Sequence, residues 1–309
     1  MKRLYPAEHY IELAMSFGCN LHCTHCMIEG TMQILTPERL EKFYALLRMN
    51  KLEKRWSGLT LTGAEITLDE RLPEMAKLAR DHGFEKIRIQ THGGQLADRE
   101  FLARLIDAGI NEFFISVTAS DADSHDKITG VAGSFDRTMQ GISNVAKYQC
   151  ASVITNTVIT DLSYQHLPSV VRLMTQYPAV SQLEFWYYFP MRSTDHKLLL
   201  VPFDQCLPAL LNAIHMASEC GIPVELKNFP QCLLGSFKSV LYNDQPQLEI
   251  DARFWDEFSR NGFYQCIYKS QCESSMCLGL STAYIHRFGW EADILHPLPA
   301  DLAKSTLDQ

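Results

Sequence analysis

The sequence predicts an α/β fold in which strands and helices alternate, followed by a smaller unit of different character. Three observations lead to this prediction. Six short segments are rich in strand-forming residues, five segments between them carry apolar residues at helical spacing, and this rhythm changes near residue 200. Strands that alternate with helices pair in parallel through right-handed crossovers. The six units would therefore curl into a partial or complete barrel, with function at the carboxyl ends of the strands.

The expected elements follow one another regularly along the first two thirds of the chain. The strands are expected at Tyr10–Ser16, Gly58–Thr62, Lys86–Thr91, Glu112–Thr118, Ser152–Thr160 and Gln182–Phe189. The helices are expected at Pro37–Asn50, Glu70–His82, Asp98–Ala108, Phe135–Gln149 and Ser163–Tyr177, with Thr36-Pro37 and Asp98 as start signals. Polar or glycine-rich residues follow several strands, so they would gather on one face.

The chain beyond residue 200 is expected to form a second, smaller unit, which divides the protein into residues 1–200 and 201–309. A helix near Phe203–Cys220 and a short strand at Pro223–Lys227 precede a loop-rich tail. No flexible linker is apparent between the two parts.

Composition and charge restrict the classes of protein to consider. The 309 residues are 46% hydrophobic and 21% charged, which indicates a soluble globular protein with ample core material. The 36 acidic residues exceed the 28 basic ones, and the formal net charge of -8 argues against nucleic acid as a partner. The chain lacks a signal peptide and any run of about 18 apolar residues, so we expect a cytoplasmic protein with no membrane partner.

Three cysteines directly after the first expected strand are the most informative feature. Cys19, Cys23 and Cys26 stand at positions i, i+4 and i+7 of one loop. Three thiolates at this spacing can bind one soft metal centre and leave one position open for another ligand. The alternative is a structural zinc site completed by His22 or His25. Metal binding in a reducing compartment fits these cysteines better than a disulfide framework does.

With these residues the chain resembles the radical S-adenosylmethionine (radical SAM) enzymes, whose signature is Cys-x3-Cys-x2-Cys after the first barrel strand. The segment Leu61-Thr62-Gly63-Ala64-Glu65 is similar to the family's Thr-Gly-Gly-Glu segment, with Ala64 in place of the second glycine. The resemblance covers roughly residues 10–200. It implies a partial (β/α)6 TIM-like barrel and a [4Fe-4S] cluster whose open iron is chelated by S-adenosylmethionine (SAM). It also implies reductive cleavage of SAM to a 5′-deoxyadenosyl radical, which abstracts hydrogen from an organic substrate.

The resemblance also implies which residues bind the cofactor. Gly63 and Ala64 would offer backbone groups to the SAM ammonium and Glu65 a compensating carboxylate; in isolation, Glu65 would be read as an exposed residue after a tight turn. The other expected cofactor residues are His25, Gln90, His92, Ser116, Thr118 and Asn156. His25 replaces an aromatic residue and would pack near adenine, or is a solvated loop residue. Asn156 would alternatively satisfy backbone groups in its strand.

A second cysteine group lies in the tail. Cys266, Cys272 and Cys277 share one loop, and Cys232 lies upstream. Four thiols make a complete set, which favours a filled auxiliary [4Fe-4S] cluster over zinc. The tail resembles the SPASM and twitch auxiliary-cluster domains, although its spacing departs from theirs, so Cys206 or Cys220 could replace Cys232.

The substrate is not specified by these motifs. Relatives of this size act on ribosomally made peptides and on small metabolites, so we expect either peptide (RiPP) or natural-product maturation, or epimerisation or dehydrogenation of a sugar-like or aminoglycoside-like molecule. The barrel begins by residue 10, so no separate leader-binding domain is expected before it. Cys206 and Cys220 are candidate hydrogen donors, and the expected reductant is of the flavodoxin or ferredoxin type. A non-catalytic zinc or electron-transfer metalloprotein is the remaining alternative.

Overall fold

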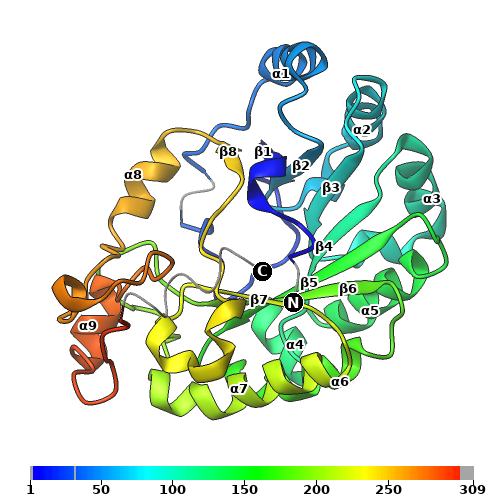
Figure 1. The fold of residues 1–309 in the computed structure, drawn as a ribbon. Coiled ribbons are helices and arrows are strands. Elements are labelled where there is room, and N and C mark those ends of the chain that lie inside the picture. The colour runs from blue at the N-terminus through cyan, green and yellow to red at the C-terminus, as the bar shows by residue number, and fades with distance from the viewer. Residues whose placement is uncertain (1–2, 31–32, 300–309) are drawn as a thin grey trace.

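A single curled sheet of eight parallel strands organises the protein. The computed structural model describes residues 3–30 and 33–299. The strands are β1 Tyr10–Ser16, β2 Gly58–Gly63, β3 Lys86–Thr91, β4 Glu112–Ser116, β5 Ser152–Ile159, β6 Val180–Tyr187, β7 Val224–Lys227 and β8 Gln247–Glu249. Their order in the sheet is β7-β6-β5-β4-β3-β2-β1-β8. The sheet forms a partial barrel (Figure 1), as the sequence predicts.

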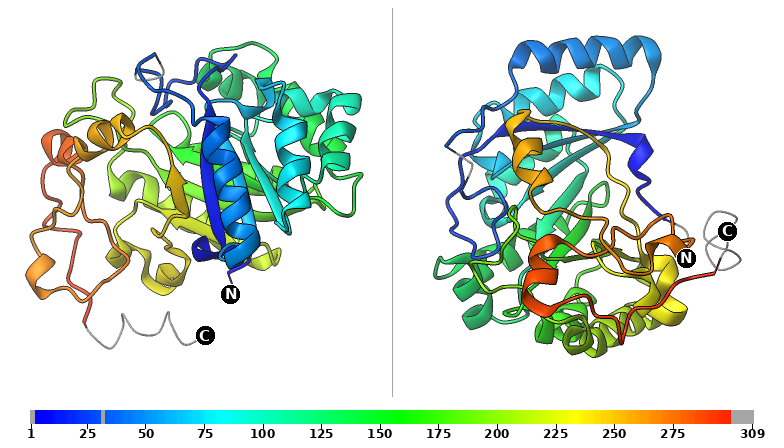
Figure 2. Two further views of the ribbon diagram at one scale, coloured as in Figure 1. Left: turned by 90° about the horizontal axis from the view of Figure 1, so that it is seen from above. Right: turned by 90° about the vertical axis from the view of Figure 1, so that its left-hand side faces the viewer.

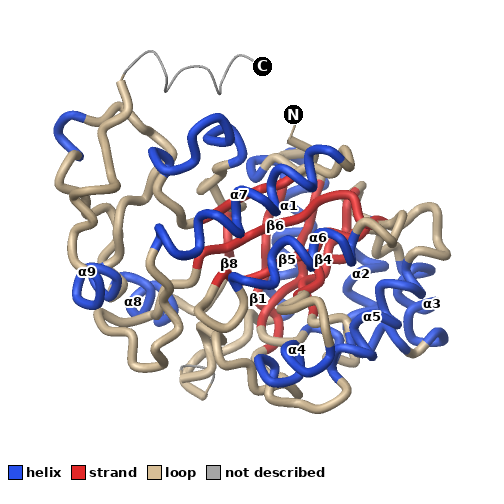
Figure 3. Tube along the Cα trace, turned by 90° about the horizontal axis from the view of Figure 1, so that it is seen from below, coloured by secondary structure: helices blue, strands red, loops and turns tan. Residues whose placement is uncertain are grey.

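Helices cover the outer face of this sheet, as Figures 1 and 2 show. The α-helices are α1 Leu40–Glu53, α2 Leu72–Asp81, α3 Arg99–Ala108, α4 Ala122–Thr129, α5 Ser134–Val145, α6 Leu167–Met174, α7 Phe203–Glu219, α8 Arg253–Ser259 and α9 Thr282–Phe288. Short 3-10 segments are η1 Ala7–His9, η2 Ile66–Leu68, η3 Gly94–Ala97, η4 Tyr164–His166, η5 Gln231–Val240 and η6 Lys269–Gln271. The tail beyond α7 is rich in loops (Figure 3).

The sheet extends across the boundary expected near residue 200. β7 pairs with β6, and β8 pairs with β1, so both edges of the sheet come from residues after that point. Six strands were expected in the barrel; β7 was expected as a strand but assigned to the second unit, and β8 is too short to show a period in the sequence. The remaining tail, with α8 and α9, lies on the open side of the curled sheet between these two edges (Figure 1).

The helix starts differ in part from expectation. Asp98 caps α3 as predicted, because its side chain accepts the N–H groups of Glu100 and Phe101. Thr36-Pro37 does not start α1, which begins at Leu40. The N–H of Thr36 instead donates to Asp251 over 2.8 Å. The segment before α1 is therefore fixed by the tail.

The two faces of the sheet have opposite chemistry. Alternate residues of β3 show this, since Ile87 and Ile89 belong to the main apolar core, and Arg88 between them must point to the opposite, inner face. The core packs the outer face of the sheet against the helices. The inner face carries charged and polar side chains, which suits a site that handles a polar ligand.

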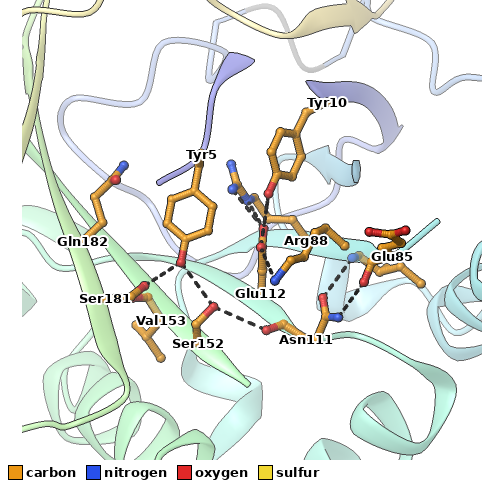
Figure 4. Close-up of polar contacts among 12 residues, drawn as sticks. Tyr5, Tyr10, Glu85, Arg88, Asn111, Glu112, Ser152, Val153, Ser181 and Gln182 are labelled. Atoms are coloured by element: carbon orange, nitrogen blue, oxygen red, sulfur yellow. Dashed lines mark hydrogen bonds and ion pairs between the residues drawn. The ribbon is translucent and has the colours of Figure 1, made fainter. Parts of the chain in front are cut away.

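The amino ends of the strands are closed by a polar network, shown in Figure 4. Glu112 is fully buried and accepts hydrogen bonds from Tyr10 and Arg88, each over 2.9 Å. The hydroxyl groups of Tyr5 and Ser181 are hydrogen-bonded over 2.7 Å. Because a buried carboxylate is tolerated only when it is paired in this way, this end of the barrel is a structural closure. A ligand site is therefore expected at the carboxyl ends.

Candidate cluster and cofactor site

The three cysteines of the first group lie on a loop that follows β1 at the carboxyl edge of the sheet. On one side, the N–H groups of His22 and Thr24 donate to the carbonyl oxygens of Thr129 and Ile128, each over 2.9 Å. On the other side, Lys197 donates to the carbonyl oxygen of Thr24 over 2.8 Å. These contacts hold the loop against the end of α4, a helix that the sequence analysis did not predict.

The sulfur atoms are half-buried and receive backbone N–H groups; the burial favours protonated thiols in the absence of a metal, and the N–H groups favour metal-bound thiolates. The pKa of the Cys23 thiol is raised to about 12, mainly by burial and in part by the neighbouring thiols Cys26 and Cys19. The N–H of Leu21 donates to Sγ of Cys19 over 3.4 Å. Backbone N–H groups also lower the pKa of Cys26, against the larger effect of burial. Hydrogen bonds of this kind accompany cluster thiolates, so the donor set fits an iron-sulfur cluster.

Gly63 brings the end of β2 directly against the end of β1. Its φ is 143°, and a Cβ atom there would lie 1.7 Å from the carbonyl oxygen of Ser16. The N–H of Ala64 donates to this same oxygen over 2.8 Å, and the N–H of Glu65 donates to the carbonyl oxygen of Gly18 over 3.0 Å. The N–H of Ala64 is therefore already used, and the carbonyl groups of the segment are what it can offer to an ammonium group.

Glu65 is fully buried, so the reading as an exposed residue after a turn is wrong. Its carboxylate accepts from the Thr91 hydroxyl over 2.6 Å and from the backbone N–H of His92 over 2.8 Å. It also accepts from the hydroxyl and the N–H of Thr67, over 2.5 and 3.1 Å. The carboxylate ties η2 to the end of β3. In this conformation no part of the carboxylate is exposed for direct contact with a ligand.

The next strand ends carry two buried polar atoms without partners. Among residues 3–30 and 33–299, Oγ1 of Thr118 and Nδ2 of Asn156 have no hydrogen-bond partner. Their side chains are 3% and 6% exposed. An unsatisfied buried group costs about 1–3 kcal/mol. A ligand with polar groups would satisfy both, so these residues fit a SAM site. The Nδ2 of Asn156 does not satisfy backbone groups, contrary to the alternative considered from the sequence.

The other expected cofactor residues lie at the same edge. Ser116 ends β4 and pairs in register with Asn156 of β5. Gln90 near the end of β3 accepts a hydrogen bond from the Thr62 hydroxyl. His25 is half-buried, and burial lowers its pKa to about 4, with Lys197 adding to the effect. A neutral, flat imidazole therefore sits in the cysteine loop.

Sequence analysis missed one contact at this site. Nε2 of His92 lies 2.7 Å from Oδ1 of Asn20, which stands between Cys19 and Cys23. His92 was expected as a cofactor residue, whereas its ring meets the cysteine loop. Asn20 lies inside the Cys-x3-Cys signature, and this position is the feature of the sequence that could have indicated a role for it.

An apolar wall closes one side of the carboxyl edge. A second apolar cluster joins Ala14 of β1 and Phe17 to Phe189, Met191 and Phe254 of α8. The rings of Phe189 and Phe263 meet edge to face, with centroids 4.8 Å apart. This wall gives one flank of the site an apolar surface.

The tail cysteines come together in the structure. Burial is the largest cause of the raised pKa of Cys232, which is about 11, and Cys277, Cys266 and Cys272 contribute to it, so the four thiols lie in one region of the tail. The N–H of Gly279 donates to Sγ of Cys277 over 3.3 Å, and that of Leu298 donates to Sγ of Cys272 over 3.4 Å. Cys232 therefore accompanies the three loop cysteines.

Cys206 and Cys220 lie elsewhere. Cys206 is buried in the apolar layer outside the sheet, and Cys220 is exposed at the end of α7. Neither lies on the inner face of the barrel, where a hydrogen donor to a substrate radical would have to stand. Their role as hydrogen donors stays a prediction without geometric support.

Within 3–30 and 33–299, no three His, Cys, Asp or Glu side chains are grouped closely enough to hold a single metal ion. No helix in this part of the chain is long and apolar enough to cross a membrane.

Comparison with known proteins gives a consistent result. The family model described as the radical SAM superfamily matches residues 13–174. A probable GTP 3′,8-cyclase from Thermoplasma volcanium is 29% identical over 177 residues, which cover 56% of this chain and 52% of that protein. An AdoMet-dependent heme synthase from Methanosarcina barkeri is 26% identical over 184 residues, 58% of this chain and 51% of that protein. The chain thus spans about half the length of these curated relatives.

The fold also has neighbours among solved structures. The crystal structure of Streptococcus suis SuiB bound to S-adenosylmethionine matches with a TM-score of 0.56 and 13% identity, over 71% of this chain and 49% of that one. At this identity the likeness concerns the fold.

Proposed function

This chain belongs to the radical SAM superfamily, and on that premise we propose that it cleaves SAM reductively and abstracts hydrogen from an organic substrate. One observation carries the proposal: the cysteine loop and the end of β2 meet through the bonds of Ala64 to Ser16 and of Glu65 to Gly18. These bonds bring the start of the cysteine loop next to the segment of the buried Glu65, at the carboxyl edge of a partial barrel. Cys19, Cys23 and Cys26 would hold a [4Fe-4S] cluster with an open iron.

The cluster and SAM, when bound, supply a one-electron cleavage that yields a 5′-deoxyadenosyl radical. The protein's own residues hold and orient the cofactor. The carbonyl groups of Gly63 and Ala64 would accept from the ammonium of SAM, and the buried charge of Glu65 favours that cation. The unpartnered atoms of Thr118 and Asn156 would take up polar groups of SAM.

For the substrate, we propose a small organic molecule. The curated relatives are named for a nucleotide cyclisation and for heme synthesis, and these names do not support peptide maturation, which was one of the reactions expected from the sequence. The polar inner face of the barrel suits a substrate with several hydrogen-bonding groups. A flavodoxin-type or ferredoxin-type protein would supply the electron.

We also propose a second, filled [4Fe-4S] cluster on Cys232, Cys266, Cys272 and Cys277. Two observations support it: Cys277, Cys266 and Cys272 each contribute to the raised pKa of Cys232, and backbone N–H groups donate to two of the sulfurs. A four-iron cluster is larger than one zinc ion, so its ligands stand further apart. Among the described residues no three His, Cys, Asp or Glu side chains are close enough to bind one metal ion, which is compatible with that wider spacing. The shortened tail would then act as a SPASM-like or twitch-like unit.

Anaerobic iron and sulfide analysis tests the proposal, combined with electron paramagnetic resonance (EPR) and an assay for 5′-deoxyadenosine. The wild type is compared with a variant in which Cys19, Cys23 and Cys26 are all alanine. We expect about eight irons to fall to about four, and cleavage of SAM to be lost. Zinc in place of iron, or cleavage that survives in the variant, would refute it.

A further inference from the structure

We infer that His92 is a positioning residue that fixes the cysteine loop, at Asn20, to the buried carboxylate of Glu65. The inference rests on the proposed function, because the loop matters through the cluster that its thiols would hold. It concerns a contact between residues 72 positions apart in the chain.

The hydrogen bonds of His92 define its tautomer. The N–H of Gly94 donates to Nδ1 over 3.0 Å, so Nδ1 carries no proton. In the neutral ring the proton then sits on Nε2, which faces Oδ1 of Asn20 over 2.7 Å. The backbone thus orients the ring, and the ring donates to the loop.

Glu65 supports the other side of His92. One carboxylate oxygen accepts the backbone N–H of His92 over 2.8 Å and lies 3.2 Å from Nε2. The carboxylate is itself fixed by Thr91 and Thr67. A rigid chain of contacts therefore runs from η2, through the end of β3, to the residue next to Cys19.

This chain of contacts adds a side-chain anchor to the first half of the loop, whose backbone is held before Cys19 by the bond from the N–H of Glu65 to the carbonyl oxygen of Gly18. The bonds from His22 and Thr24 to the end of α4 fix the second half of the loop. Asn20 is exposed, and together with His92 and Arg137 it lines a cavity of about 160 Å³. Without the imidazole, water would fill the enlarged cavity, and the first half of the loop would lose its side-chain anchor.

The expected consequence is a less ordered position for Cys19. Residues that orient metal ligands through a hydrogen bond typically change metal affinity or activity by about 10- to 100-fold when removed. We expect His92→Ala to weaken SAM binding by about tenfold and to speed loss of iron. His92→Gln keeps an N–H donor and should restore part of the effect.

The test uses His92→Ala, His92→Gln, Asn20→Ala and the double alanine variant, with His215→Gln on the exposed face of α7 as a matched control. The first readout is hydrogen exchange of the backbone amides of residues 19–26 in the metal-free protein. The second is the concentration of SAM at which the change in the EPR signal of the reduced cluster is half complete. Both should change in each single alanine variant, and the double variant should add little, because the two residues share one bond.

Unchanged exchange at residues 19–26 together with unchanged SAM affinity in His92→Ala would overturn the inference, as would fully additive effects in the double variant. If His92→Ala does not fold, Asn20→Ala and His92→Gln decide by the same readouts. A wild type without iron at the triad would refute the proposed function instead, and the exchange measurement would still decide the role of His92.

Discussion

The ring of Tyr284 stacks on the ring of Phe203, with centroids 4.2 Å apart and ring planes 15° apart. The backbone N–H of Phe203 donates to the Tyr284 hydroxyl over 3.0 Å, and that hydroxyl donates to Glu291 over 2.5 Å. The start of α7 and the cysteine-bearing tail are therefore joined at one side chain. Since Tyr284 is 1% exposed, its hydroxyl cannot exchange these partners for water.

Replacing Tyr284 by Phe should destabilise the protein by about 1–3 kcal/mol, because the N–H of Phe203 and the carboxylate of Glu291 lose a buried partner. Urea unfolding of the metal-free protein measures this. Tyr264→Phe is the control, since Tyr264 is 60% exposed. Equal effects of the two substitutions would contradict the anchoring role.

Replacing Gly63 by Ala should be far more harmful than replacing Gly83 by Ala. Both glycines have positive φ, 143° and 92°, so both substitutions strain the backbone, at roughly 1 kcal/mol. A Cβ at Gly63 would also collide with Ser16, whereas no atom lies within 4 Å of a Cβ at Gly83. Melting temperatures of the two metal-free variants separate strain from collision. Similar values would show that β1 can move away from β2.

Glu12 should make the protein less stable as the pH rises. Burial raises its pKa from 4.5 to about 7 and Glu184 adds to this, while Arg88 and Lys227 oppose it. Between the unfolded pKa of 4.5 and the folded pKa of about 7, the folded protein holds a proton that the unfolded chain has lost. The free energy of unfolding therefore falls as the pH rises from about 5 to 7, and it stays at the lower level above pH 7.

Glu12→Gln removes this titration. The free energy of unfolding of the variant minus that of the wild type should therefore be about 2 kcal/mol more positive at pH 8 than at pH 5. Urea unfolding at both values tests this, with Glu53→Gln on the exposed end of α1 as control. A stability difference between Glu12→Gln and wild type that does not change with pH would rule out the titration.

The tail cysteines should be distinguishable by metal content. Cys232→Ser is expected to lower the iron bound by about four per chain and to leave the SAM-responsive EPR signal in place. Cys220→Ser should change neither, because Cys220 is exposed at the far end of α7. Iron loss in Cys220→Ser, with none in Cys232→Ser, would reassign the fourth ligand.

Much of the barrel is predictable from local sequence, because each strand–helix unit carries its own period. The bounds of β1 and β3 agree with expectation. β8 has only three residues, and its partner β1 lies at the other end of the chain, so no local pattern in the sequence reveals it. α4 was missed because it is short and polar.

The candidate site divides in the same way. The three cysteines and Gly63 are marked by spacing and by the family segment, which are local features. The burial of Glu65 and the contact of His92 with Asn20 depend on which strand ends meet, and no spacing in the sequence encodes that. The choice of Cys232 over Cys206 and Cys220 likewise requires the path of the tail.

The origin of the two outer strands limits how the protein can be dissected. A fragment that ended at residue 200 would lack both β7 and β8, and the backbone N–H and C=O groups on the outer edges of β6 and β1 would then be unpaired. Unprotected strand edges of this kind recruit other chains. We expect such a fragment to self-associate, so the cysteine loop next to β1 has to be studied in the intact polypeptide.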